Sequence, residues 1–160
     1  MKINLEGAVN EIVEEITYQA KSRAFRAANE LRNSALTVLR GERSGKVYKK
    51  PGTYGSRMTK QTKSLLKDYG HKLRGGQLYR ASAPGEPPAN RSGNLRLSWR
   101  PQSASERIGK TVTIKPAITT EVKYAPYLEE GTDRMAPRPF EDPIIEKAMP
   151  RISQIFKEPY

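Results

Sequence analysis

The stretch Tyr124–Pro143, YAPYLEEGTDRMAPRPFEDP, decides the fold because it joins a β-like segment to the last helical pattern of the chain. Its four prolines each fix their own φ and favour extended backbone at the residue before. Gly131 is placed where the chain can use a positive φ, which other residues resist. This composition is too rigid for a linker. Two interpretations stay open: a structured loop that covers the end of a sheet, or a contact loop that fits a neighbouring subunit.

The N-terminal part of the chain predicts one long helix. From about Gly7 to Leu39 the apolar residues recur in steps of three and four, the spacing of an amphipathic helix. At 1.5 Å per residue this helix is roughly 50 Å long, more than a small core needs at both ends. Alanines line its middle, Gly41 is expected to end it, and its overhang is a candidate contact with a neighbouring subunit. Residues 1–6 alternate apolar and polar side chains and predict a short extended piece.

A small sheet is predicted between the helix and the proline-rich stretch. Leu95–Trp99, Thr111–Lys115 and Ile118–Tyr124 alternate with a period of two, as strands do. Lys115–Ala117 is expected to be a tight connection between the second and third of these strands. The core candidates are Trp99, Val112, Ile114, Ile118 and Val122.

A last helix is predicted after the proline-rich stretch. Asp142 is expected to cap it with Pro143 at its first position, and Pro150 is expected to kink or break it. Its apolar face consists of Ile144, Ala148, Ile152 and Ile155. The predicted fold class is therefore α+β: a long N-terminal helix, a small antiparallel β-sheet, an extended basic arm and a C-terminal helix. We expect a single domain over residues 1–160, with residues 41–94 inserted as a Gly/Pro-rich basic arm, largely mobile.

The charge of the chain is concentrated in one segment. Between Arg40 and Arg100 fifteen basic residues meet three acidic ones, so this window accounts for the whole net charge of +12. A solvated face is the simplest interpretation, but such segregation favours a polyanion or an acidic partner. Four tyrosines among these charges fit either base stacking or protein contacts. The candidate contacts with DNA or an acidic partner are Lys46, Lys49, Lys50, Arg57, Lys60, Lys63, Lys67, Lys72, Arg74 and Arg80.

The sequence contains no recognisable catalytic or metal-binding pattern. It has no cysteine, and its single histidine, His71, lies in a Gly/Lys-rich stretch. No phosphate-binding loop, nucleophile–base pair or calcium loop is found. We therefore expect no enzyme, no cofactor and no metal. No apolar run has the length of a membrane span or the form of a leader, so we expect cytoplasmic synthesis and no membrane partner.

Two blocks of the sequence resemble one protein family. They are Tyr124–Thr132 with Pro137–Phe140 and Pro143, and Ala81–Ala89 with Ser92–Leu95 and Ser98. Their order and spacing, between a long helix and a short one, resemble the tail-completion, or head–tail joining, proteins of siphophages. The resemblance covers the chain apart from an insertion between about Lys50 and Leu78.

The resemblance implies a virion structural protein of the head–tail neck, assembled in the cytoplasm of the host bacterium. It implies a homo-oligomeric ring, hexameric in the assembled particle, around the channel for genomic DNA and beside head-completion and tail-terminator or tail-tube proteins. Phe140 is expected to present its ring to a neighbour, and Arg138 to pair with Glu129 or with a neighbour's carboxylate. The candidate interface residues are Tyr124, Tyr127, Glu129, Gly131, Thr132, Arg138, Pro139 and Phe140. The alternative function is a free-standing basic nucleic-acid-binding protein.

Overall fold

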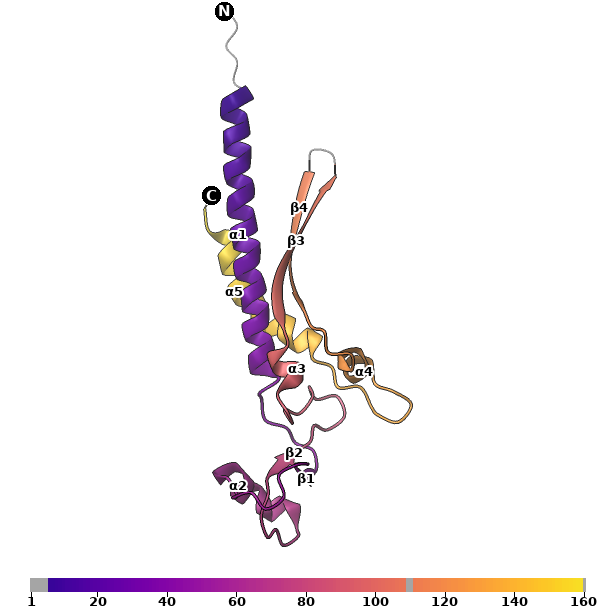
Figure 1. Cartoon of the computed structure of the whole chain (residues 1–160). Coiled ribbons are helices and arrows are strands. Elements are labelled where there is room, and N and C mark those ends of the chain that lie inside the picture. The colour runs from indigo at the N-terminus through magenta and orange to yellow at the C-terminus, as the bar shows by residue number, and fades with distance from the viewer. Residues whose placement is uncertain (1–5, 109–110, 160) are drawn as a thin grey trace, which may run out of the picture. The chain divides into compact units, whose positions relative to one another are not determined.

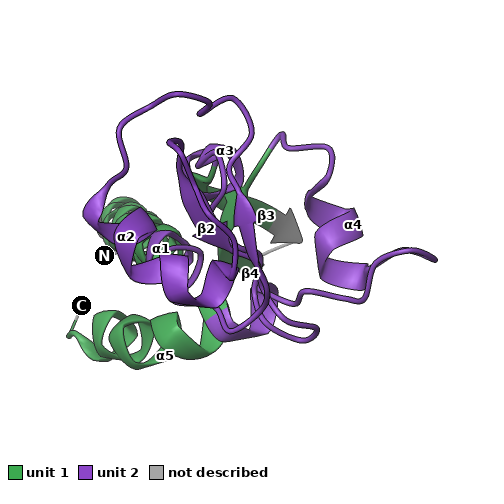
Figure 2. Ribbon diagram, turned by 90° about the horizontal axis from the view of Figure 1, so that it is seen from below, with its two compact units in different colours: residues 1–34, 99–120, 144–160 green, residues 35–98, 121–143 purple. Residues whose placement is uncertain are grey.

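The computed structural model describes residues 6–108 and 111–159. It confirms the α+β class, with a long N-terminal helix, small antiparallel sheets and a C-terminal helix (Figure 1). Two compact units divide the chain (Figure 2). Unit 1 consists of residues 1–34, 99–120 and 144–160, and unit 2 of residues 35–98 and 121–143. The single-domain organisation stays a prediction, and of the extended piece expected at residues 1–6, residues 1–5 lie outside the described ranges.

Helix α1 spans Glu6–Val38, as its periodicity predicts. Its alanine face is the buried one, because Ala24, Ala27, Ala28 and Ala35 are all fully shielded from solvent. Small side chains at this spacing let neighbouring elements approach the helix closely. The helix ends just before Gly41, where the carbonyl oxygen of Val38 accepts from the Gly41 N–H at 3.2 Å.

In unit 1 a two-stranded hairpin accompanies the helices. Strands β3 (Arg100–Ile108) and β4 (Thr111–Thr119) pair antiparallel, from Arg100 opposite Thr119 to Ile108 opposite Thr111. The connection expected at Lys115–Ala117 is wrong, because these residues lie inside β4. A proline is tolerated there because each strand of a two-stranded ribbon has an open edge.

The first predicted strand is also wrong. Leu95–Trp99 does not begin the sheet, since Asn94–Leu97 forms the short helix α3 and β3 starts at Arg100. Of the predicted third strand, only Ile118 and Thr119 belong to β4. Among the core candidates Trp99 is buried, Val112 is 41% exposed, and Ile114, Ile118 and Val122 are half-buried. A ribbon of two strands cannot bury the side chains that a larger sheet would.

The segment predicted as an extended arm has a fold of its own, within unit 2. Strands β1 (Val47–Lys49) and β2 (Leu78–Arg80) pair antiparallel, and helix α2 (Lys60–Tyr69) contacts both strands. Thr59 caps α2 at its start, and Gly70 ends it with a φ of 70°. The side chain of Thr62 is fully buried and donates to the Gln77 side-chain oxygen at 2.7 Å. The sequence also indicates a basic helix from Lys60 to Leu73, with Leu65, Leu66, Tyr69 and Leu73 as a thin apolar stripe, and α2 forms over Lys60–Tyr69. The mobility expected for the arm stays a prediction.

Helix α5 spans Glu141–Lys157 and runs through Pro150 without ending there. It begins earlier than predicted, so Asp142 and Pro143 lie within its first turn instead of capping it. Three of its four predicted apolar positions, Ile144, Ala148 and Ile155, are buried, and Ile152 is half-buried.

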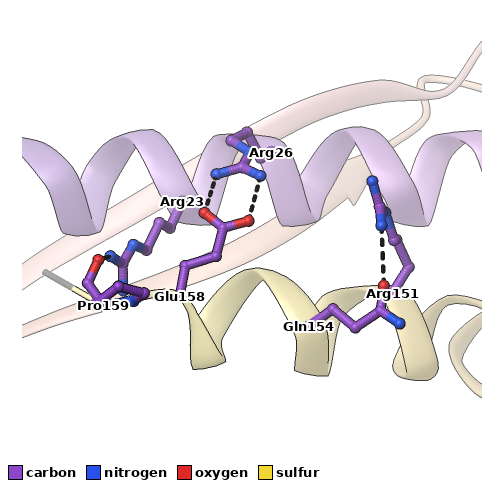
Figure 3. Close-up of polar contacts among 6 residues, drawn as sticks. All are labelled: Arg23, Arg26, Arg151, Gln154, Glu158 and Pro159. Atoms are coloured by element: carbon purple, nitrogen blue, oxygen red, sulfur yellow. Dashed lines mark hydrogen bonds and ion pairs between the residues drawn. The ribbon is translucent and has the colours of Figure 1, made fainter.

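Polar contacts tie the end of the described chain to α1 within unit 1. The guanidinium of Arg26 donates to both carboxylate oxygens of Glu158, at 2.6 and 2.7 Å, and Arg23 donates to the carbonyl oxygen of Pro159 (Figure 3). This ion pair lowers the pKa of Glu158.

Candidate assembly surface

The two sequence blocks, the one from Ala81 to Ser98 and the one from Tyr124 to Pro143, lie together in unit 2. Arg138, from the second block, donates to the carbonyl oxygen and the hydroxyl of Ser82 in the first block. The N–H of Gly85 donates to the carbonyl oxygen of Pro137 at 3.1 Å. The proline-rich stretch and the Ala81–Ala89 segment therefore form one hydrogen-bonded structure.

The proline-rich stretch contains a short helix and a tight turn. Helix α4 spans Ala125–Glu130, and Gly131 follows it with a φ of 81°. A Cβ at Gly131 would lie 2.8 Å from the carbonyl oxygen of Met135, so both the conformation and the space require glycine. Thr132 and Met135 exchange backbone hydrogen bonds of 2.8 and 3.0 Å. The positive φ predicted for Gly131 is confirmed, and its place in an interface stays a prediction.

Glu129 and Arg138 do not pair with each other as predicted. The carboxylate of Glu129 instead accepts from the N–H of Phe140 at 2.8 Å and, at 3.4 Å, from that of Glu141. These donors belong to the start of α5, where backbone N–H groups lack partners within the helix. The guanidinium of Arg138 is directed to Ser82. Both charged side chains therefore stabilise the fold of the stretch.

Phe140 is wrongly assigned to an interface. Its side chain is 1% exposed, which makes it one of the two largest fully buried side chains among the described residues. A ring buried in its own chain is not presented to a neighbour. The sequence suggested exposure because Phe140 follows Pro139 in a loop, but the loop folds back and places the ring in the core.

Other interface candidates remain accessible. Tyr124 and Tyr127 are 44% and 62% exposed, Thr132 is exposed, and Pro139 is half-buried. Large aromatic side chains that a single chain leaves in water are the type that anchors protein interfaces. Their role as contacts stays a prediction.

A cavity of about 650 Å³ lies in unit 2, where the two blocks meet. Its walls are mainly apolar and include Leu95 and Leu128, and three arginines line it: Arg91, Arg96 and Arg138. The Nε of Arg96 is buried and has no hydrogen-bond partner in the described part of the chain. Sequence reasoning did not select Arg91 or Arg96, although both flank the Ser92–Leu95 block.

Glu86 ties the first block to the segment after α1. Its carboxylate accepts from the hydroxyl of Ser44 at 2.6 Å, from the N–H of Ser44 at 3.0 Å and from the N–H of Ala83 at 2.8 Å. These donors stabilise the charged form, with the Ser44 hydroxyl contributing most, and lower the pKa of Glu86 to about 2. This carboxylate thereby holds the turn at Ala83–Glu86 against Ser44.

The candidate basic contacts are distributed over the α2–β1–β2 fold. Arg80 is not a free contact, because it forms an ion pair with Asp68 and donates to the carbonyl oxygen of Gly45 at 3.1 Å. Lys50 is half-buried, and Lys49 lies over the ring of Tyr54 at 5.7 Å. The remaining candidates are exposed: Lys46, Lys49, Arg57, Lys60, Lys63, Lys67, Lys72 and Arg74.

We compared the chain with known proteins in three ways. Neither the family models nor the curated proteins nor the solved structures contain a match to this chain.

Within residues 6–108 and 111–159, no three side chains of His, Asp or Glu are grouped to hold a metal ion. His71 is exposed and packs edge-on against the ring of Tyr69 at 5.5 Å. No helix in these ranges has the length and apolar character needed to cross a bilayer.

Proposed function

We propose that this chain is a structural subunit of the neck of a long-tailed bacteriophage, where it completes the tail and joins it to the capsid. One observation carries the proposal. The two blocks that resemble the head–tail joining family are separated by residues 99–123, yet they bond to each other through Arg138–Ser82 and Gly85–Pro137. Motifs that form one surface are better explained by a shared role than by chance similarity of two short segments.

Unburied apolar surface supports an assembly role. Tyr124 and Tyr127 at the joined blocks, and Val9, Ile12 and Val13 on α1, all keep more than 40% of their surface in water. A closed ring of identical subunits would cover such surface by repeating one contact. Association with neighbouring neck and tail proteins would cover the rest.

The basic surface of unit 2 fits two partners within the same function. Exposed Lys63, Lys67 and Arg74 would face either the genomic DNA in the channel or an acidic surface of an adjoining ring. The same surface favours the second candidate function, a free-standing basic nucleic-acid-binding protein. That alternative leaves the joined blocks without a role.

Electron microscopy of particles made without this gene tests the proposal. Filled heads separate from complete tails are expected, and supplying the wild-type gene in trans should restore joined particles. Normal joined particles in the absence of the gene would refute the neck function. An unjoined phenotype that the gene in trans does not repair would point to damage elsewhere in the genome.

A further inference from the structure

The hairpin of unit 1 leaves both of its edges open in the described part of the chain. Strands β3 and β4 form a sheet of two strands (Figure 1), and the side chains of residues 102–106 are exposed on both faces of β3. Two strands alone are marginally stable in water, and a further strand would add a row of backbone hydrogen bonds. An open strand edge is therefore a candidate interaction surface.

A proline shows which backbone groups of the hairpin point outward. Pro116 has no N–H and lies opposite Ser103 inside the ladder, so its nitrogen faces away from β3. Residues of an antiparallel pair alternate between positions that bond to each other and positions that face outward. Ser103 therefore has an outward N–H, and so does Ser105. Within residues 6–108 and 111–159, neither of these two N–H groups has an acceptor.

The two edges of the hairpin differ in how well they could receive another strand. On β4 the row of outward donors is interrupted in its middle, because Pro116 lies between Ile114 and Ile118. On β3 the single proline, Pro101, is the second residue, so the donors that follow it are not interrupted. Edge strands that avoid pairing carry prolines or charges. The β3 edge has neither at residues 102–105, which are Gln, Ser, Ala and Ser.

The charges of β3 favour a second copy of β3 as the partner. Arg100 and Glu106 lie on one face of the strand, three residues before and three residues after Ser103. An antiparallel copy centred on Ser103 therefore brings each Arg100 opposite the Glu106 of the other copy. Opposite charges at such positions stabilise a strand pair. Both side chains are exposed, and Arg100, which also has a contact within its own chain, has five N–H donors that can serve a second acceptor.

We propose that β3 adds to β3 of a second copy, antiparallel and with Ser103 opposite Ser103, so that two hairpins form one continuous sheet. Any other antiparallel register loses both ion pairs between Arg100 and Glu106. Because the contact has two-fold symmetry, it closes at two copies and does not by itself build a ring. The pairing therefore goes beyond the proposed neck function and does not depend on it.

Proline substitution tests the edge. Ser103→Pro and Ser105→Pro each remove an outward N–H and keep the hydrogen bonds between β3 and β4. Sedimentation velocity over a wide range of concentration should show a dimer of the wild-type chain, and each variant should associate at least about tenfold more weakly. Val112→Pro is the matched control, since it removes an outward N–H from an exposed position of β4 and should leave the dimer unchanged. A wild-type chain that is monomeric throughout, or a loss of association in Val112→Pro, overturns the proposal.

Charge exchange tests the register. Arg100→Glu alone and Glu106→Arg alone place like charges opposite each other, so each variant should dimerise at least about tenfold more weakly. An equimolar mixture of the two should dimerise again, because every facing pair in the mixed dimer joins a glutamate to an arginine. Lys115→Glu, at an exposed position of β4, is the charge control and should change association no more than about twofold. A mixture that stays as weak as the separate variants shows that the register is wrong. Circular dichroism of every variant checks the fold.

A single cysteine locates the two-fold axis. The chain has no cysteine, so Ser103→Cys can form a disulfide only between two copies. Oxidation should give a covalent dimer, because Cα atoms of directly paired residues are about 5.5 Å apart, a distance that a disulfide spans. Thr113→Cys is the matched control, since it is exposed on β4, away from the proposed contact, and should give no dimer. Equal yields from the two positions would refute the pairing.

Discussion

At the scale of single residues, burial separates side chains that stabilise the fold from those available to partners. Phe140 and Tyr127 belong to the same proline-rich stretch, yet one is 1% and the other 62% exposed. Glu129 and Glu86 are acidic side chains in a basic unit, and both accept backbone hydrogen bonds. Their roles follow from these contacts and not from their charge alone.

Replacing Phe140 by Ala should destabilise the chain. Removal of a fully buried aromatic ring costs about 3–5 kcal/mol of unfolding free energy, because transfer energy is lost and a cavity remains. Urea denaturation followed by circular dichroism measures it. Tyr127→Ala is the matched control, since it removes an exposed ring from α4 and should cost much less. Equal stability of the two variants would contradict the buried role.

The hydrogen bonds to Glu86 predict a pH dependence of stability. Its pKa is about 2 in the folded chain against 4.5 for the unperturbed group. A carboxyl whose pKa is lowered by folding stabilises the folded chain at pH values above its pKa in the unfolded chain. This stabilisation is lost as the pH falls through its pKa in the folded chain. The difference in unfolding free energy between wild type and Glu86→Gln should therefore be present at neutral pH and shrink between pH 4.5 and 2.

Denaturation curves at a series of pH values measure this difference. Glu106→Gln, at an exposed position of β3, is the control for removal of a surface carboxylate. A constant difference between wild type and Glu86→Gln across this window would show that the three hydrogen bonds do not stabilise the ionised carboxylate.

At the scale of elements, long periodic segments were predictable and short ones were not. Thirty-three residues of α1 and seventeen of α5 give several turns of consistent spacing, which fixes their type. Leu95–Trp99 is five residues long, and its alternation fits a strand while its structure is the single turn of α3. Strands β1 and β2 have three residues each, and they pair across an intervening helix. Nothing local in such segments specifies a distant partner.

In the candidate site, only the features that depend on local sequence were predictable. The backbone requirement at Gly131 is local, so sequence alone identified it. Arg91 and Arg96 become notable only once Leu95 and Leu128 have formed the cavity beside them. The exposure of Phe140 was wrongly predicted because the path of the chain after Pro139 depends on a distant contact. The carboxylate of Glu129 accepts a hydrogen bond from the N–H of Phe140.

The turn after α4 gives a test of its geometry. Gly131→Ala should destabilise the chain by more than about 1–2 kcal/mol, because a positive φ strains any L-residue and the new methyl group would meet Met135. Gly52→Ala is a matched control, since Gly52 has a φ of 75° with open space at its Cβ position. Thermal or urea unfolding measures both, and equal costs would show that the close approach to Met135 contributes nothing.

At the scale of the whole molecule, the chain is a small protein with large exposed surfaces, some basic and some apolar. Its net charge is +12, and only 36% of its residues are hydrophobic. Unit 2 carries the exposed lysines of α2, and unit 1 carries exposed apolar side chains of α1, among them Val9, Ile12 and Val13. These side chains are accessible to partners.

Binding to DNA should depend strongly on salt and not on sequence. If the exposed bases contact phosphates, the logarithm of the affinity falls by about 0.9 per contact for each tenfold rise in salt. Fluorescence anisotropy with two unrelated duplexes at several salt concentrations measures both properties. Lys63→Glu with Lys67→Glu should weaken binding to both duplexes equally. A strong preference for one duplex would favour the free-standing nucleic-acid-binding protein, and no binding at low salt would leave an acidic protein surface as the partner.

The division of the chain into units has a consequence for its synthesis. Unit 2 uses no residue after position 143, whereas unit 1 needs residues 144–160 as well as α1. During translation Arg23 and Arg26 of α1 therefore lack these acceptors until Pro159 and Glu158 have left the ribosome. Products interrupted before residue 144 would leave unit 1 incomplete, and the apolar surface of incompletely folded chains is what chaperones and proteases recognise. The cell would thus remove incomplete chains before they accumulate.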